Sequence, residues 1–461
     1  MGLGEALLAA AEFAMRETAL FAAVGFLLLG ISDLAVDLVW IVCSSWRLLS
    51  GRGNGLSADQ LPPPERPGRL AVFTPAWDEA AVIRDMLQHS LGSFEHDDYR
   101  IYVGCYPNDP ATVREVRRVQ DPRVRLVIGP IAGPTTKADC LNRLWEAMLA
   151  DEEQEGSRFK AVVLHDAEDV VHSAELRIFD RLIERYDLVQ LPVVPMIDPD
   201  SRWISAHYAD EFAESHAKEL VVRGQIGAGI PSAGVGCAFS REALGRIAAR
   251  QGGLPFDADS LTEDYELGLK LRDAGGSRAF VRIAETRGGE AVATREYFPA
   301  TIEAAVNQKA RWMAGIALSG WDRLGWAGGL AERWMRVRDR QSVLAAALLL
   351  AGYVSFGFWT LLKVPEMLTG WAPASISDAL ETVLLINLAM LVWRLAMRVG
   401  FVTRAYGWRE GFRSIPRVAV SNAIAMLAAW RAIARYRSLR KGGPTKWEKT
   451  AHSFPAGLAA Q

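Results

Sequence analysis

The stretch KAVVLHDAED (160–169) joins a short apolar run to a cluster of acidic side chains, and this pattern organises the middle of the chain. Apolar runs of this kind predict strands at 69–74, 99–106, 124–128, 160–165, 188–194 and 277–284. Helical patterns lie between them at 79–90, 111–119, 137–150 and 174–185. Alternation of strands with helices favours a mostly parallel sheet with helices on both faces. The predicted fold class is therefore α/β, with a Rossmann-like, mostly parallel sheet.

Acidic residues follow the ends of three of the predicted strands. Asp78 and Glu79 come after the first strand, Asp109 after the second, and Asp166 and Glu168 after the fourth. In sheets of this type, ligands bind outside the C-terminal ends of the strands. We therefore expect these carboxylates to line one pocket.

The acidic cluster after the fourth strand has the chemistry of a metal site. One or two carboxylates together with phosphate oxygens form a typical Mg²⁺ site, and Asp166, Glu168 and Asp169 are candidate ligands. A bound cation also lets an acidic pocket attract a nucleotide diphosphate. The alternative is an exposed loop whose acids favour the N-terminus of the following helix. Because other motifs accompany the cluster, we favour a metal site that holds Mg²⁺ or Mn²⁺.

A second acidic motif, Thr262-Glu263-Asp264, opens a helical pattern at 265–273. The spacing of Ser260 and Glu263 predicts a capping box at the start of this helix. A capped helix start is a rigid mount for a general base, and Asp264 is the candidate that takes a proton from an acceptor hydroxyl.

A third motif places Gln308, Arg311 and Trp312 at i, i+3 and i+4, hence on one helical face. Arginine binds phosphate oxygens with two hydrogen bonds, and tryptophan stacks on a sugar or a nucleobase. The alternative is an amphipathic helix at a membrane interface, where both residues are common. A glycine-rich segment at 224–236 lacks the known phosphate-loop patterns and is interpreted as a flexible loop that closes on the substrate.

Apolar residues gather in blocks at 19–46, 343–364 and 380–401. A bilayer span takes roughly 20 apolar residues, so each block is long enough. A fourth stretch at 415–433 contains Asn422 and Arg431 and either spans the bilayer or lies on its surface; the distribution of arginines favours the surface. Asp33 and Asp37 interrupt the first block, so we expect one of its faces to look toward protein or water.

The charges give the orientation and exclude one class of partner. Arginines flank the spans at 47 and 52, at 333–340 and at 404–417, whereas 365–379 has no lysine or arginine. By the positive-inside rule, three spans place both the central region and the C-terminal tail on the cytoplasmic side of a bacterial inner membrane. The net charge of −2 gives no basis for nucleic-acid binding. The four cysteines show no metal spacing and are expected to be reduced packing residues.

These boundaries divide the chain into six parts. We predict a transmembrane helix at 1–50, a linker at 51–68, a cytoplasmic α/β domain at 69–300, interfacial helices at 301–341, two transmembrane helices at 342–401, and an interfacial helix with a basic tail at 402–461.

Taken together, the motifs resemble those of the membrane-bound family 2 glycosyltransferases, which include cellulose and hyaluronan synthases. The segments HDAEDVVH (165–172) and KWEKTAHSFP (446–455) more closely resemble the glycosyltransferase part of bacterial phage-adsorption proteins. The resemblance covers nearly the whole chain and implies a GT-A-type fold inserted between transmembrane helices. Relatives of this type often continue into a C-terminal region that binds a cyclic dinucleotide, for which this chain is expected to have no room after Gln461.

The resemblance also implies residue roles. Asp78, Glu79 and Asp109 would contact the nucleobase and ribose, Lys137 would lie near the diphosphate, Asp166 with its acidic neighbours would bind the metal, Asp264 would be the base, and Gln308, Arg311 and Trp312 would bind the diphosphate and acceptor. One departure is that the family's DxD reads Asp166-Ala167-Glu168 here, so the second metal ligand is either Glu168 or Asp169.

The sequence thus predicts an inner-membrane, inverting glycosyltransferase that transfers a sugar from a UDP-sugar to a growing surface polysaccharide. One alternative is transfer of a single sugar to a lipid carrier, and another is a non-catalytic membrane scaffold with a degenerate transferase fold. The expected partners are a UDP-sugar donor, a glycan or lipid-linked acceptor and the lipid bilayer. Three spans are too few to build an export channel, so an export partner or a homo-oligomer is also expected.

Overall fold

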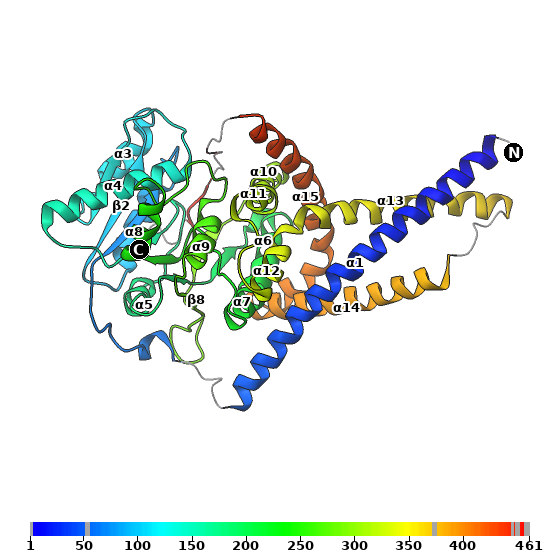
Figure 1. Cartoon of the computed structure of the whole chain (residues 1–461), viewed down its shortest axis with the longest axis horizontal. Helices are drawn as coiled ribbons and strands as arrows, with labels where there is room; N and C mark the ends of the chain where they lie inside the picture. The colour runs from blue at the N-terminus through cyan, green and yellow to red at the C-terminus, as the bar shows by residue number, and fades with distance from the viewer. Residues whose placement is uncertain (1–2, 51–55, 371–375, 444–446, 448–451, 456–461) are drawn as a thin grey trace.

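An α/β domain lies at one end of the molecule, and three long helices project from its other side (Figure 1). The computed structural model describes residues 3–50, 56–370, 376–443, 447 and 452–455. The first part of the predicted linker (51–55), part of the predicted outer connection (371–375) and much of the C-terminal motif at 446–455 lie outside the described residues.

The domain is built on a seven-stranded sheet with the order β3-β2-β1-β4-β7-β5-β8. Its strands are β1 (Leu70–Pro75), β2 (Tyr99–Cys105), β3 (Val124–Ile128), β4 (Ala161–Leu164), β5 (Leu188–Gln190), β7 (Cys237–Ser240) and β8 (Arg278–Phe280). β1 to β4 pair in parallel, β7 runs antiparallel to β4 and β5, and β5 pairs in parallel with β8. The predicted mostly parallel α/β sheet is confirmed.

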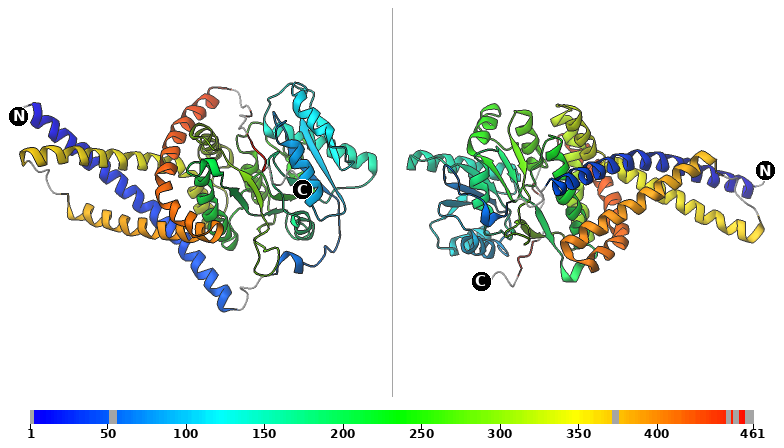
Figure 2. Two further views of the ribbon diagram at one scale, coloured as in Figure 1. Left: turned by 180° about the vertical axis from the view of Figure 1, so that it is seen from behind. Right: turned by 90° about the horizontal axis from the view of Figure 1, so that it is seen from below.

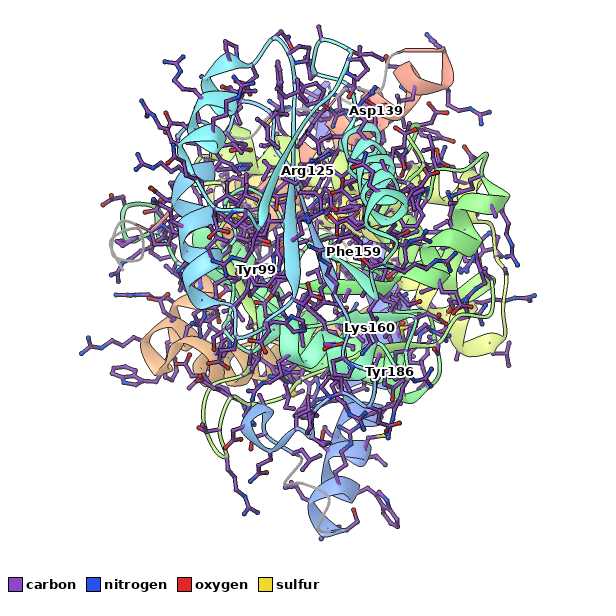
Figure 3. All side chains as sticks on the ribbon, turned by 90° about the vertical axis from the view of Figure 1, so that its left-hand side faces the viewer. Tyr99, Arg125, Asp139, Phe159, Lys160 and Tyr186 are labelled. Carbon is purple, nitrogen blue, oxygen red and sulfur yellow. The ribbon has the colours of Figure 1, made fainter. Side chains whose placement is uncertain are left out.

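Helices cover both faces of this sheet. α2 (Ile83–Ser93), α3 (Pro110–Arg118) and α5 (Glu175–Leu182) pack on one face, and α4 (Lys137–Glu155), α8 (Arg241–Arg250) and α9 (Glu263–Asp273) pack on the other. Two further helices, α6 (Ser205–Glu214) and α7 (Leu220–Gln225), lie between this sheet and the long helices. Successive strand residues point to opposite faces, so Val72 and Phe73 of β1 belong to two different hydrophobic clusters. The edge of the domain that carries Tyr99, Arg125 and Phe159 faces away from the long helices (Figure 3).

Several features of the domain differ from the prediction. The single strand expected at 188–194 is two strands, because Pro192 has no N–H to continue the ladder. After it, β6 (Val193–Met196) leaves the main sheet and pairs in parallel with β9 (Thr294–Tyr297). Sequence patterns also missed the four-residue β7 and the helical region from α6 to α7, which is joined by the π-helical segment η3 (Ser215–Glu219).

A second group of helices connects the domain to the long helices. α10 (Ile302–Trp312) continues through the π-helical segment η4 (Met313–Ser319) into α11 (Gly320–Leu324), and α12 (Leu330–Arg340) follows. The remaining short segments, η1 (Ala58–Gln60) and η2 (Pro199–Ser201), lie in loops.

Three of the described helices are long and apolar enough to cross a membrane: α1 (Leu3–Leu49), α13 (Ser342–Thr369) and α14 (Asp378–Tyr406). These correspond to the three predicted spans. α15 (Trp408–Arg440) lies across their base in both Figure 1 and Figure 2. It buries Ile424, Ala428 and Ala432 in a cluster with residues of α10 and η4, which agrees with a helix that does not span.

Charged residues join the long helices to the domain. Asp33 of α1 accepts a hydrogen bond from Arg338 at 2.9 Å, and Asp37 accepts one from Lys218 at 2.6 Å. Trp393 of α14 also donates to Asp37, at 2.8 Å. Acidic side chains in apolar helices are costly unless they are paired, so the prediction that this face of α1 looks toward protein is confirmed.

Candidate active site

A cavity of about 400 Å³ opens at the carboxyl edge of the sheet and extends toward the long helices. Several motifs that are far apart in sequence line it together: Glu79, Lys137, Asp166, Glu168, Asp264, Gln308, Arg311 and Trp312. The predicted residues Asp78, Asp109 and Asp169 are not among its lining residues.

Asp166 follows β4 and faces the first turn of α4. Lys137 at that turn donates to Asp166 at 2.8 Å. Burial disfavours the charge of Lys137, but the carboxylates of Asp166, Glu263 and Asp264 outweigh this effect and raise its pKa. Lys137 is therefore a fixed positive charge at the floor of the cavity, where it can meet a phosphate oxygen.

Asp169 anchors the acidic loop from inside the protein. Its carboxylate accepts from His165 Nδ1 at 2.8 Å and from the backbone N–H of Asp166 at 3.1 Å. Glu175 lies 3.1 Å from the other ring nitrogen of His165. Burial opposes the charge of His165, but hydrogen bonds to Asp169 and Glu175 raise its pKa to about 10. This arrangement engages Asp169 with His165 and directs Glu168 into the cavity.

Glu168 meets two residues that form a group suited to a metal ion. His452 of the C-terminal segment lies 3.0 Å from Glu79 through Nδ1 and 3.2 Å from Glu168 through Nε2. One ligand atom from each of the three residues lies within 4.8 Å of the others. Burial raises the pKa of Glu168 to about 8, with Asp166 and Glu79 adding to the rise while His452 opposes it.

The donor set fits a divalent cation. Glu79, Asp166, Glu168, Glu263, Asp264 and Glu296 line the cavity together with Lys137 and Arg311, and Arg223, Arg338 and Arg394 line it as well. Such an excess of buried carboxylates is costly without a cation. Carboxylate oxygens and an imidazole nitrogen suit Mn²⁺, and carboxylates with phosphate oxygens suit Mg²⁺.

Asp264 lies in the first turn of α9 and projects into the cavity. Its Oδ1 accepts from the backbone N–H of Tyr265 at 2.7 Å. Burial raises the pKa of Asp264, against the lowering effect of Lys137. On its other side, a Cβ added at Gly234 would lie 2.3 Å from Asp264 Oδ2. Asp264 is thus held closely by the backbone on two sides.

The predicted capping box ahead of this helix is wrong. The N-cap residue is Thr262, whose side chain makes no capping hydrogen bond. The hydroxyl of Ser260 instead donates to Glu266 at 2.7 Å and accepts from the N–H of Thr262 at 3.2 Å. Glu263 is left to face the cavity, and burial next to Asp264 raises its pKa to about 7.

α10 brings Gln308, Arg311 and Trp312 to the opposite wall. Arg311 donates to the backbone oxygen of Leu261 at 3.3 Å, which ties this helix to the loop before Asp264. Gln308 Oε1 is buried and has no hydrogen-bond partner among the described residues. A buried, unpaired polar atom in a cavity wall is typical of a group that a ligand satisfies.

Asp78 and Asp109 lie at the same edge of the sheet but are hydrogen-bonded to each other. Asp109 caps α3 by accepting from Thr112 N at 3.2 Å, and it accepts from the N–H of Asp78 at 2.6 Å. Asp78 has a φ of 56°, a conformation that is strained for a residue with a side chain and is often found at functional sites.

Sequence reasoning missed several polar or aromatic cavity residues, among them His216, Glu296, Trp447 and His452. The last two lie in the KWEKTAHSFP motif, which was a usable signal. The N–H of Trp447 donates to Thr135 at 2.8 Å, next to Lys137. His216 lies in a π-helical segment and Glu296 in a strand, and no sequence pattern predicted either element. The glycine-rich segment supplies Ser232, Ala233 and Val235 to the wall.

Comparisons with known proteins show the family to which the chain belongs. Residues 67–315 match the model of the family described as "Glycosyltransferase like family 2". The chain belongs to the family 2 glycosyltransferases, with a GT-A-like sheet flanked by long apolar helices.

Individual relatives add detail. The chain is 36% identical to bacteriophage adsorption protein B of Escherichia coli (strain K12), over 96% of this chain and 63% of that protein. The values are the same for bacteriophage N4 adsorption protein B of Escherichia coli O157:H7. The chain thus spans about 63% of the length of these curated relatives. A solved mannosyltransferase from Pyrobaculum calidifontis, in complex with GDP-Man and Mn²⁺, is 14% identical with a TM-score of 0.48, over 90% of this chain and 99% of that one.

Proposed function

We propose that this chain is an inverting glycosyltransferase of the bacterial inner membrane, which transfers a sugar from a UDP-sugar to a growing surface polysaccharide. The observation that carries the proposal is the shared cavity. It joins a metal-suited group (Glu79, Glu168, His452) to a buried carboxylate at Asp264 and to Arg311 and Trp312.

The acidic end of the cavity is the donor site in this proposal. Glu168 and His452, with Asp166 beside them, would hold Mg²⁺ or Mn²⁺, which when bound neutralises the diphosphate and makes it a better leaving group. Lys137 and Arg311 add fixed positive charge for the phosphate oxygens. Asp78, Glu79 and Asp109, which the hydrogen bonds of Asp78 to Asp109 and of Glu79 to Thr112 hold together after β1 and β2, would contact the nucleobase and ribose.

Asp264 is the general base. Its carboxylate takes the proton from an acceptor hydroxyl while the oxygen attacks the anomeric carbon of the donor. The bond from that carbon to the diphosphate oxygen breaks, and its electron pair leaves with UDP. A single displacement of this kind inverts the anomeric centre. Trp312 and Gln308 would orient the reacting sugars in the cavity wall.

The apolar helices and the distribution of arginines support the proposed arrangement in the cell. α1, α13 and α14 would cross the bilayer, and the α/β domain, α15 and the basic tail would face the cytoplasm, where UDP-sugars are made. With three spans, export of a polymer would call on a partner protein or on an oligomer of this chain.

Calorimetric titration of UDP into the purified full chain tests the donor site. We expect binding that strengthens at least about tenfold with Mn²⁺, because the metal offsets the repulsion between carboxylates and phosphates. Glu168→Ala should lose this gain. Equal binding with and without the metal in the wild type would contradict the proposal.

A further inference from the structure

The cavity has a second end that the donor site leaves unused. One end holds Glu168 and His452, and the other is lined by Asp33 of α1 and Arg394 of α14. Both helices are among the three that are long and apolar enough to cross a membrane. A single space therefore leads from the metal-suited group, past Asp264, to the membrane helices.

The membrane end reaches the surface at Arg394. The Arg394 side chain is 54% exposed, whereas the side chains of Asp33 beside it and of His452 at the donor end are each 18% exposed. α14 begins at Asp378, so Arg394 lies about 24 Å along the helix axis at 1.5 Å per residue. The hydrocarbon core of a bilayer is roughly 30 Å thick. With Asp378 at the outer boundary, the opening beside Arg394 lies near the inner leaflet.

The wall between the two ends is suited to a sugar. Phe212, Phe298 and Trp312 line it. Their ring centroids are 5.0 Å apart for Phe212 and Phe298 and 6.4 Å apart for Phe298 and Trp312. Aromatic side chains provide the flat apolar surface on which the C–H face of a sugar ring packs, and binding cavities combine such surface with a few directed polar groups.

His216 supplies one such directed group. The backbone N–H of Val193 donates to His216 Nδ1 at 2.9 Å, so the ring proton is on Nε2. Burial, reinforced by Arg282, lowers the pKa of His216 to about 3, and the ring is neutral at physiological pH. His216 lines the cavity and therefore offers a neutral donor of fixed tautomer to a hydroxyl group.

The mouth of the cavity carries balanced charges. Asp33 pairs with Arg394 and with Arg338, the latter at 2.9 Å, and Arg338 also pairs with Glu219 at 2.9 Å. Each of these arginines already faces a carboxylate, which disfavours a free anion as the occupant. A mixture of donors and acceptors matches sugar hydroxyls, which both donate and accept.

We propose that the acceptor is a saccharide carried on a membrane lipid. It enters from the inner leaflet between α1 and α14, packs on the partly buried ring of Phe212 beside His216, and presents a hydroxyl to Asp264. The inference rests on the proposed function, because it takes the Glu168 end as the donor site and Asp264 as the base. It narrows the acceptor to a lipid-linked class and adds His216 as a residue that binds it.

A transfer assay with two acceptor pools tests this inference. The purified full chain in detergent receives a labelled UDP-sugar, together with either a lipid extract or a water-soluble extract of bacterial membranes. The product is partitioned between chloroform–methanol and water. The variants are His216→Ala and Arg394→Gln, and the matched control is Arg404→Gln, which is exposed on the same helix and outside the cavity lining.

We expect the label to enter the lipid pool. Loss of one hydrogen bond should raise the amount of lipid extract needed for half-maximal transfer by about five- to tenfold in His216→Ala. The control should stay within about twofold, and Mn²⁺-dependent UDP binding should be unchanged in all three variants. Transfer to the water-soluble pool alone, or wild-type acceptor dependence in both variants, would overturn the inference while the proposed function stands. Failure of the wild type to bind UDP with Mn²⁺ would overturn both.

Discussion

Substituting Gly234 by alanine probes how precisely Asp264 must be placed. The new Cβ would lie 2.3 Å from Asp264 Oδ2, whereas carbon and oxygen atoms that are not bonded settle at about 3.3 Å. The carboxylate must therefore move by about 1 Å, and a displacement of this size costs on the order of 10²-fold in rate. Gly234 also has a φ of +79°, so alanine adds a backbone penalty of about 1 kcal/mol.

Gly227→Ala separates the two effects. Gly227 lies in the same loop with a φ of +72°, and apart from its chain neighbours no heavy atom of the described residues lies within 4 Å of the position of its added Cβ. Both variants should lose about 1 kcal/mol of stability, measured as the melting temperature in detergent. Only Gly234→Ala should slow sugar transfer, by about 10²-fold, with UDP binding intact. Equal transfer rates in the two variants would refute the placement of Asp264 as the base.

Three further predictions concern the metal, the pH dependence and the topology. His452→Ala should weaken Mn²⁺-dependent UDP binding by at least about 10- to 100-fold, which is the loss caused by removing even a residue that hydrogen-bonds a metal ligand. Asp169→Ala should mainly lower the melting temperature, because the carboxylate that holds His165 is lost. Equal metal affinity in His452→Ala and wild type would remove His452 from the site. Burial, with Lys309 adding to its effect, lowers the pKa of His207 to about 4. As pH falls below about 6.5, the unfolded chain therefore binds the proton before the folded chain does, and the free energy of unfolding should fall toward pH 4 by up to about 1.4 kcal/mol per pH unit. His207→Gln should reduce this pH dependence in melting curves. A reporter that fluoresces only in the cytoplasm should be fluorescent when fused at Gln461. Activity of a periplasmic phosphatase fused at the same position would contradict three spans.

The parts of the fold that the sequence predicted are those with regular local patterns. The runs at 69–74 and 160–165 became β1 and β4 because central parallel strands are buried on both faces and read as continuous apolar stretches. The four-residue β7 gave no such signal, since its position between β4 and β5 is set by long-range antiparallel pairing. The presence of Pro192, which lacks a backbone N–H, was a signal in the sequence that the strand expected at 188–194 is interrupted.

The candidate site was predictable where its residues follow strands or share a helical face. Lys137, Asp166 and Arg311 belong to such motifs and meet at the cavity. The choice between Glu168 and Asp169 was not accessible to sequence reasoning, because it depends on the buried His165 that engages one of the two carboxylates. His216 comes close to the site only through the packing of a π-helical segment, which has no local signature.

The central claim is that this chain transfers a sugar from a UDP-sugar with Asp264 as the base. The direct measurement is UDP release by the purified full chain, in detergent with bacterial lipid extract and Mn²⁺, across a panel of UDP-sugars. We expect one donor to stand out, and Asp264→Asn to lower its rate by about 10²- to 10⁴-fold while UDP still binds. No release from any donor, or a rate in Asp264→Asn within a few-fold of wild type, would contradict the account.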